Sequence, residues 1–251
     1  MTRWKAASIH LAISATIALT VVATMLLVWY PPPYFEAMGG DHLVAILIGV
    51  DVVLGPLITF VVFAPGKARH LIRLDLTIIG IVQLAALAYG VSVVAVARPV
   101  YLVFSVDRFD VTSANEIRPE ELAKVKRPEF KSIPLFGPVI AATRLPENDP
   151  DEQYRVLMSG IAGADINTFP QHLLPYPEMA AAALKRAKPV EKLREYNPGG
   201  VKPLEEALAK LGRTQDSVRF LPMKARARDM SVLLDAKSGA FLAIVPVSPW
   251  M

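Results

Sequence analysis

The chain has 251 residues, of which 53% are hydrophobic and 20% charged, with a net charge of +4 and no cysteine. Residues 1–99 carry six of the 27 Lys and Arg and four of the 23 Asp and Glu, so charge is concentrated in the remainder. This distribution excludes a single soluble domain, a disordered chain and a protein lying entirely within a membrane. Neither part has the basic surface that nucleic acid requires, and a chain without thiols has no disulfide or thiolate zinc site.

Three apolar windows reach the roughly 20 residues that a helix needs to cross a bilayer. They span residues 9–30, 43–63 and 74–97, and prolines or charges follow each of them. The first window is longer than the apolar core of a signal peptide and lacks a small-residue cleavage site, so we expect it to stay uncleaved. Residues 1–99 are therefore predicted to form a domain of three transmembrane helices.

Lysine and arginine predict the orientation of these spans. They precede the first span and fill the loop between the second and third, whereas the loop between the first and second has none. The positive-inside rule places the N-terminus in the cytoplasm. Three crossings then place residues 100–251 outside, in the periplasm if the membrane is a bacterial inner membrane.

Asp51 is an acid well inside the second predicted span, followed by Gly55 and Pro56. An intramembrane carboxylate costs about 3 kcal/mol on insertion scales and needs a partner. Gln83 of the third span lies at a similar depth, so one interpretation is a hydrogen bond within the bundle. A second is that Asp51 meets a donor on a partner's transmembrane helix, and a third is a proton relay, which lacks a second acid. Asp75, at the start of the third span, is expected to pair with nearby arginines.

Residues 100–251 are long enough for one compact domain. A strand is predicted over residues 100–106, continuing through Phe109 and Val111, and a helix start at Pro119. The remaining pattern predicts an α+β domain with a mainly antiparallel sheet. Further strands are expected at 139–145, 218–223, 230–234 and 241–247, the last two joined by a turn at 235–239, and further helices from Asp149-Pro150 and at 178–187, 190–196 and 204–211.

The sequence shows no arrangement typical of catalysis, a metal site or a cofactor. Its four histidines are scattered, and no nucleotide-binding or nucleophile motif is present. Asp107-Arg108 and Asp165 with Asn167 are possible catalytic groups, but surface ion pairs and turn residues explain them more simply. An intramembrane aspartyl protease needs two facing acids, and only Asp51 qualifies. We therefore predict a protein that is not an enzyme.

The order and spacing of several short motifs across residues 1–111 resemble the type IV pilin accessory protein family, the TfpX/TfpZ group. These motifs are Trp29-Tyr30-Pro31, the 49–56 run, Pro65-Gly66-Lys67, Asp75-Leu76, Gln83, Tyr89-Gly90, Arg98-Pro99-Val100-Tyr101 and Val106-Asp107-Arg108-Phe109. The resemblance implies a multi-pass inner-membrane protein that is associated with a cognate type IV pilin and takes part in pilus assembly. It transfers no catalytic residue.

Pilins of this kind have an apolar N-terminal helix with a charged amine and a glutamate near its start. We expect the second and third spans to hold that helix, with Asp51, Gly55, Pro56 and Gln83 as candidate contacts. Juxtamembrane contacts to the pilin head are expected from the segment after the third span (Arg98, Tyr101, Asp107, Arg108 and Phe109). Other inner-membrane pilus machinery and the lipid bilayer are further expected partners.

The sequence leaves two alternative functions open. A membrane-tethered sensor with a ligand-binding outer domain would need an output domain, and the cytoplasmic loop over residues 64–73 is too short for one. An enzyme that modifies pilin or glycan would need catalytic residues that the sequence does not display.

Overall fold

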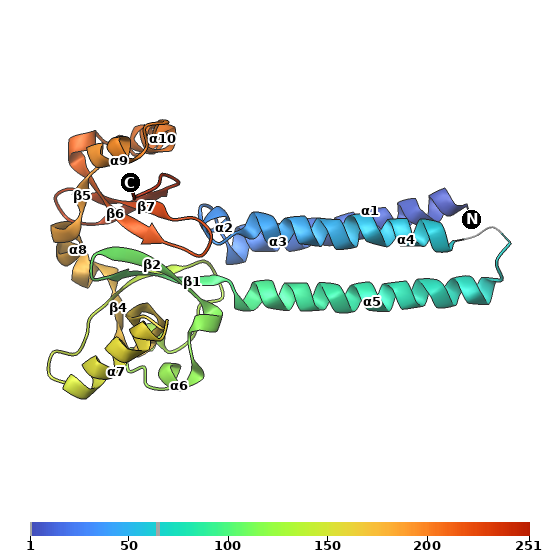
Figure 1. Ribbon diagram of the computed structural model, residues 1–251, viewed down its shortest axis with the longest axis horizontal. Helices are drawn as coiled ribbons and strands as arrows, with labels where there is room; N and C mark the ends of the chain where they lie inside the picture. Colours follow the sequence, from blue (N-terminus) through green and yellow to red (C-terminus); the bar gives the residue numbers. More distant parts are fainter. Residues whose placement is uncertain (1, 64–65) are drawn as a thin grey trace.

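The computed structural model describes residues 2–63 and 66–251 and is elongated, with long helices at one end and a C-terminal domain (residues 100–251) at the other (Figure 1). Within the described residues, three helices are long and apolar enough to cross a membrane. They are built from α1 (Arg3–Thr24) with the π-helical η1 (Met25–Trp29); α3 (Gly40–Leu47), the π-helical η2 (Ile48–Leu54) and α4 (Gly55–Val62); and α5 (Arg69–Val96).

Each predicted span overlaps one of these helices. The first and third helices begin several residues before the predicted windows. The helical backbone continues through the charged residues that precede each apolar stretch, because their long side chains can reach water from a helix end. Asp75 forms its ion pair with Lys67 rather than with the expected arginines. Pro65, predicted to end the second span, lies outside the described residues.

The loop between the first two long helices packs into the C-terminal domain. It contains α2 (Tyr34–Ala37), and Tyr34, Ala37 and Met38 share a hydrophobic cluster with Phe104 and Phe109 of the domain. Tyr30 closes the same end of the bundle, since its hydroxyl donates to the Val94 carbonyl of α5 at 2.8 Å. The helices and the C-terminal domain are therefore joined by shared apolar packing as well as by the chain.

One mixed sheet organises the C-terminal domain in the described part of the chain, in the order β4-β3-β1-β2-β6-β7-β8, with β5 also pairing to β6. Its pairings are mostly antiparallel, as predicted, but β1 with β3 and β2 with β6 are parallel. The strands are β1 (Pro99–Ser105), β2 (Arg108–Ser113), β3 (Val139–Thr143), β4 (Leu173–Pro175), β5 (Lys188–Pro189), β6 (Val218–Lys224), β7 (Met230–Asp235) and β8 (Phe241–Val245).

The chain reverses direction after β1, so the prediction of one strand continuing through Phe109 and Val111 is wrong. Phe109 lies on β2, which pairs antiparallel with β1 across a turn at Val106 and Asp107. Val106 has a φ of 59°, a conformation that β-branched residues rarely adopt. No glycine or asparagine signalled this turn.

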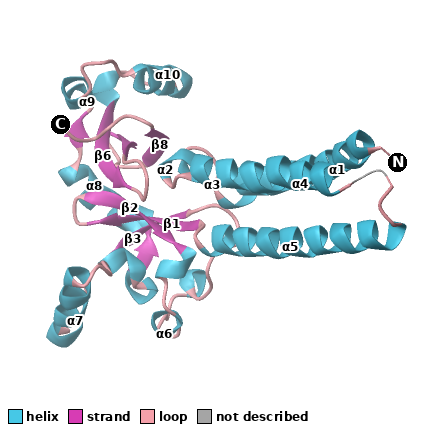
Figure 2. Ribbon diagram, turned by 45° about the vertical axis from the view of Figure 1, so that its right-hand side comes forward, coloured by secondary structure: helices cyan, strands magenta, loops and turns pink. Residues whose placement is uncertain are grey.

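Helices cover both faces of the sheet (Figure 2). Leu193 of α9 and Leu204 of α10 pack with Phe220 of β6 on one side. Asp149 caps α7 by accepting from the Glu152 amide at 3.0 Å, with Pro150 in the first helical position, as predicted. The α-helices are α6 (Pro119–Leu122), α7 (Pro150–Ile161), α8 (Ala180–Arg186), α9 (Glu191–Tyr196) and α10 (Lys202–Leu211); the 3₁₀ turns are η3 (Ala114–Glu116), η4 (Pro128–Phe130), η5 (Ile166–Thr168), η6 (Pro170–His172), η7 (Tyr176–Met179) and η8 (Gln215–Ser217).

Candidate functional site

A cavity of about 220 Å³ lies among the long helices and is lined by four polar side chains. His10 and Ser14 come from α1, Asp51 from η2 and Gln83 from α5. The other lining residues are small or apolar: Ile13, Ile17, Gly80, Leu84 and Leu87. Three separate helices thus bring polar groups to one place within otherwise apolar segments.

Asp51 is 9% exposed, and its Oδ1 atom has no hydrogen-bond partner among the described residues. The described contacts include no hydrogen bond between Asp51 and Gln83, although both side chains line the same cavity. An unpaired buried polar atom costs about 1–3 kcal/mol, and more when it is charged. Asp51 is therefore a buried acceptor whose pairing is incomplete within the described part of the chain.

The geometry around Asp51 depends on Gly55 and Pro56. The Gln83 side-chain amide lies so close to Gly55 that a Cβ atom there would overlap it. Pro56 supplies no N–H to the preceding turn, and the backbone before it is π-helical, with the Gly55 amide donating to the Val50 carbonyl. The result is a widened helical segment that contains Asp51.

His10 and Ser14 were not selected from the sequence. His10 Nδ1 lies 2.6 Å from the hydroxyl of Thr59 on α4, which is buried, and Ser14 is buried beside the cavity. The two residues are four apart, so a helix presents them on one face. That spacing was the available signal, but it gains meaning only once α1 is known to face η2 and α5.

Arg98 and Tyr101 follow α5 in the chain. Arg98 donates to the Ala95 carbonyl at 2.6 Å and to the Pro134 carbonyl at 3.1 Å. Tyr101 is fully buried on β1, and burial raises the pKa of its phenol to about 12. Arg98 therefore links the end of α5 to the C-terminal domain, whereas Tyr101 packs within the domain, with its hydroxyl donating to the Ser132 carbonyl at 3.4 Å.

Asp107, Arg108 and Phe109 do not form one exposed surface, because Phe109 lies in the hydrophobic cluster that also contains Val94 of α5. The β1–β2 hairpin places Asp107 and Arg108 at its turn, at the end remote from α5, and Phe109 is fully buried (Figure 1). Arg108 donates to Asp110 at 2.9 Å and to Asp165 at 3.2 Å. This arrangement favours the ion-pair interpretation of the two motifs over catalytic acids.

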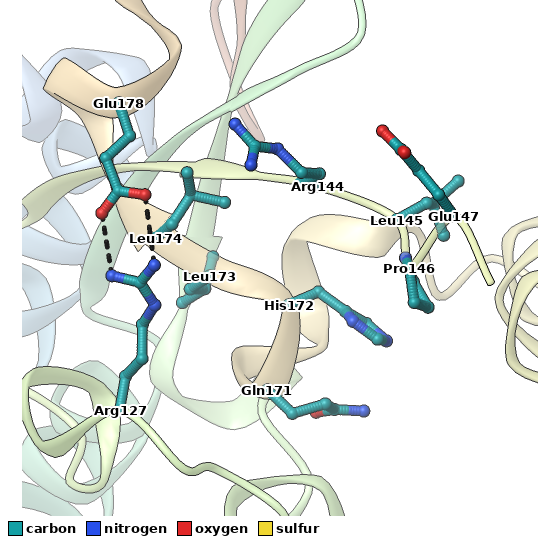
Figure 3. A pocket seen from close by; sticks show the side chains of 10 residues that line it. All are labelled: Arg127, Arg144, Leu145, Pro146, Glu147, Gln171, His172, Leu173, Leu174 and Glu178. Atoms are coloured by element: carbon teal, nitrogen blue, oxygen red, sulfur yellow. Dashed lines mark hydrogen bonds and ion pairs between the residues drawn. The ribbon is translucent and has the colours of Figure 1, made fainter. Parts of the chain in front are cut away.

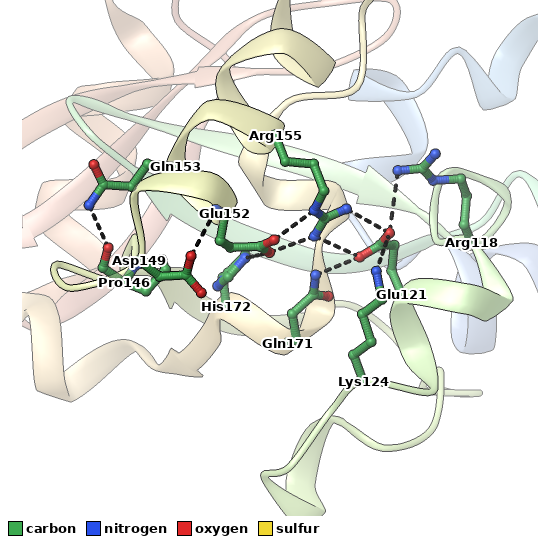
Figure 4. Close-up of polar contacts among 10 residues, drawn as sticks. All are labelled: Arg118, Glu121, Lys124, Pro146, Asp149, Glu152, Gln153, Arg155, Gln171 and His172. Carbon is green, nitrogen blue, oxygen red and sulfur yellow. Dashed lines mark hydrogen bonds and ion pairs between the residues drawn. The ribbon is translucent and has the colours of Figure 1, made fainter.

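A network of charged side chains fixes α7 to the domain (Figure 4). Glu121 is 4% exposed at its backbone and side chain together, and it accepts two hydrogen bonds from Arg155, at 2.8 and 3.1 Å, and one from Lys124 at 3.0 Å. Burial raises the pKa of Glu121. The hydrogen bonds from Arg155, Lys124 and Gln171 together lower the pKa by more than burial raises it, so the net shift is downward. The carboxylate is thus held ionised inside the fold.

A pocket of about 460 Å³ adjoins this network (Figure 3). Arg127 and Glu178 form a two-bond pair at one side, with N–O distances of 2.8 and 3.1 Å. His172 lines the other side, but its Nε2 is occupied by Glu152 at 2.7 Å. No group of three or more histidine or acidic side chains in residues 2–63 and 66–251 could hold a metal ion.

The chain is similar along most of its length to fimbrial assembly proteins of Dichelobacter nodosus. It is 31% identical to the serogroup I protein over 96% of this chain and 93% of that protein, and equally similar to the serogroup E1 protein. The sequence model described as fimbrial assembly protein FimB matches residues 1–39. This chain belongs to the FimB family of fimbrial assembly proteins.

Membership of the FimB family confirms the resemblance to a type IV pilus accessory family and extends it well beyond residue 111. A shorter relative, the protein of serogroups C1 and C2, is 36% identical over 47% of this chain and 90% of its own length. No solved structure matches. The family places this chain in fimbrial assembly, and its name describes an assembly role rather than a reaction.

Proposed function

We propose that this FimB-family protein is a non-enzymatic factor for type IV pilus assembly that binds the apolar helix of a cognate pilin in the bacterial inner membrane and stabilises it or presents it to the pilus machinery. The observation that carries the proposal is Asp51, a buried acid with an unpaired oxygen at a cavity among membrane-length helices. Such an acceptor is complementary to a charged amine on a partner helix. Gln83 and His10 at the same cavity can donate to a carboxylate.

The packing of α5 supports a partner helix. Val94 is the only buried residue of this 28-residue helix, all of which the structure describes. Leu84 lines the cavity and is 62% exposed. Because lipid and a partner helix are equally apolar, α5 can exchange one for the other at little cost, and polar groups then decide which helix binds.

The distribution of charge supports the topology that this function needs. Lys67, Arg69 and Arg73 surround the start of α5, and Arg3 and Lys5 lie at the start of α1, so the positive-inside rule puts both helix ends in the cytoplasm. The C-terminal domain then lies in the periplasm, on the side of the pilin head.

We propose a different surface for the pilin head from the one expected from the sequence. Every residue of β1 is buried, so this strand offers no contact. The exposed apolar side of α7, formed by Tyr154, Leu157 and Ile161, is the better candidate. The Arg155–Glu121 pair holds the other side of α7, so this surface keeps a fixed position.

Site-specific crosslinking in cells tests the proposal. A photo-reactive residue at Leu84 is expected to trap the pilin, and one at Val82 is not, since Val82 is equally exposed at 61% but lies on the opposite side of α5. A third probe at Leu157 tests contact with the pilin head. Equal trapping from Leu84 and Val82 would contradict a specific helix site.

Substitution of Asp51 tests the acid itself. Asp51→Asn is expected to reduce pilin co-purification by about tenfold, as for loss of one charge-assisted hydrogen bond. Val53→Ala, on the same helix but with an exposed side chain, is the control. Unchanged pilin recovery at normal levels of the accessory protein would refute the role, whereas loss of the accessory protein itself would favour Asp51 as an internal contact.

A further inference from the structure

The segment of residues 132–138, here called the 132–138 loop, joins the C-terminal domain to two of the long helices. The Gly137 amide donates to the carbonyl of Val28, within the last turns of the first long helix, at 2.9 Å. Arg98, at the end of α5, donates to the Pro134 carbonyl. The backbone of the loop is thus fixed at the level where both helices end.

The apolar side chains at the tip of this loop are largely exposed. Leu135 is 66% exposed and Phe136 is 74% exposed. Residues 132–143 contain no charged side chain, and the exposed Lys131 precedes them. A large exposed aromatic and a leucine side by side are costly in water but favourable among lipid chains.

The first long helix shows what surrounds this loop. Leu27 precedes Val28 and is among the most exposed apolar side chains of the chain, as expected of a residue that faces lipid. Since the Gly137 amide donates a hydrogen bond to the Val28 carbonyl, the tip of the loop lies beside the part of the first long helix that we assign to the membrane. Lys131 lies on the flank, where a cation meets lipid phosphates.

We propose that the 132–138 loop inserts Leu135 and Phe136 into the outer leaflet of the membrane, among lipid acyl chains, and so forms a fourth membrane contact of the protein. The inference rests on the proposed membrane insertion of the three long helices. The loop anchors the C-terminal domain from the side of β3, whereas the α2 loop anchors it by packing on β1 and β2. Two anchors on different strands fix the tilt of the domain over the helix bundle.

Fluorescence quenching by lipid tests the insertion, and the absence of native cysteine allows single labels. Phe136→Cys and, separately, Leu135→Cys carry an environment-sensitive fluorophore in the full-length protein, reconstituted without pilin into vesicles whose lipids bear a quencher near the headgroup. Val106→Cys is the control in water, because Val106 has nearly the same exposure, 72%, at the remote turn of the β1–β2 hairpin. Ile81→Cys, on the middle of α5, is the control in lipid, read with a deep quencher.

The expected result is loss of most emission at positions 135 and 136, with no loss at position 106. Quenching at position 81 without quenching at 135 and 136 would overturn the inference and leave the proposed function standing. A blue shift at 136 without lipid quenching would mean that protein covers the tip, which also overturns it. Absence of quenching at position 81 would overturn the membrane placement of the helices and, with it, both proposals.

Discussion

Glu152 makes the stability of the C-terminal domain dependent on pH. The hydrogen bonds from Arg155, opposed by burial and aided by a hydrogen bond from His172, lower the pKa of Glu152 to about 2. A carboxylate whose pKa is lowered in the folded state contributes its full stabilisation at pH values above its pKa in the unfolded state, about 4.3. That contribution is lost as the pH falls toward 2. We expect the free energy of unfolding, measured by urea titration with circular dichroism in detergent, to decline across this window.

Removing the charge isolates this residue. Glu152→Gln is expected to lower the free energy of unfolding at pH 7 by about 2 kcal/mol, as for lost hydrogen bonds to a charged group. The decline of the free energy of unfolding at acid pH, here called the acid limb, should then be less steep. Glu147→Gln is the matched control, because Glu147 is exposed on the neighbouring loop. If both variants keep the same acid limb, another group is responsible.

The β1–β2 hairpin carries strain at Val106. Its φ of 59° costs about 1–2 kcal/mol for a residue other than glycine, and its exposed side chain gains little packing in return. Val106→Asn is expected to raise the free energy of unfolding by about 1 kcal/mol, since asparagine adopts this conformation more readily. Thermal unfolding should shift upward by a few degrees. Val106→Thr separates polarity from strain: it is β-branched, so an equal gain in that variant would contradict the explanation.

Strands were predictable from the sequence where the turn between them contains residues that favour a turn. The β7–β8 hairpin followed from Asp235 and Gly239: Asp235 accepts from the Lys237 and Ser238 amides, and Gly239 has a φ of 71°. The β1–β2 turn has no such residues, so two strands were predicted as one. Strands β4 and β5 have only three and two residues and include prolines, so neither shows a strand pattern.

The distribution of apolar residues along the whole chain predicted the three long helices and identified Asp51 as an acid within one of them. It did not predict the cavity around Asp51. A helix that is apolar on all sides gives no pattern that identifies the face it buries. His10 and Ser14 on α1 therefore had no assigned neighbour until the packing of α1 against η2 was known. Gln83 lines the same cavity as Asp51, yet its amide packs on Gly55, and the described contacts include no hydrogen bond from it to Asp51.

The orientation of the whole molecule is a separate prediction that decides whether a pilin can reach it. Lys202→Cys on α10 is expected to react with a membrane-impermeant maleimide in spheroplasts, because its side chain is exposed on the domain assigned to the periplasm. Ala68→Cys, in the exposed loop before α5, is expected to react only after the membrane is opened. The reverse pattern would place the C-terminal domain in the cytosol. The proposed function places the pilin head in the periplasm, so the cavity at Asp51 would then require a different partner helix.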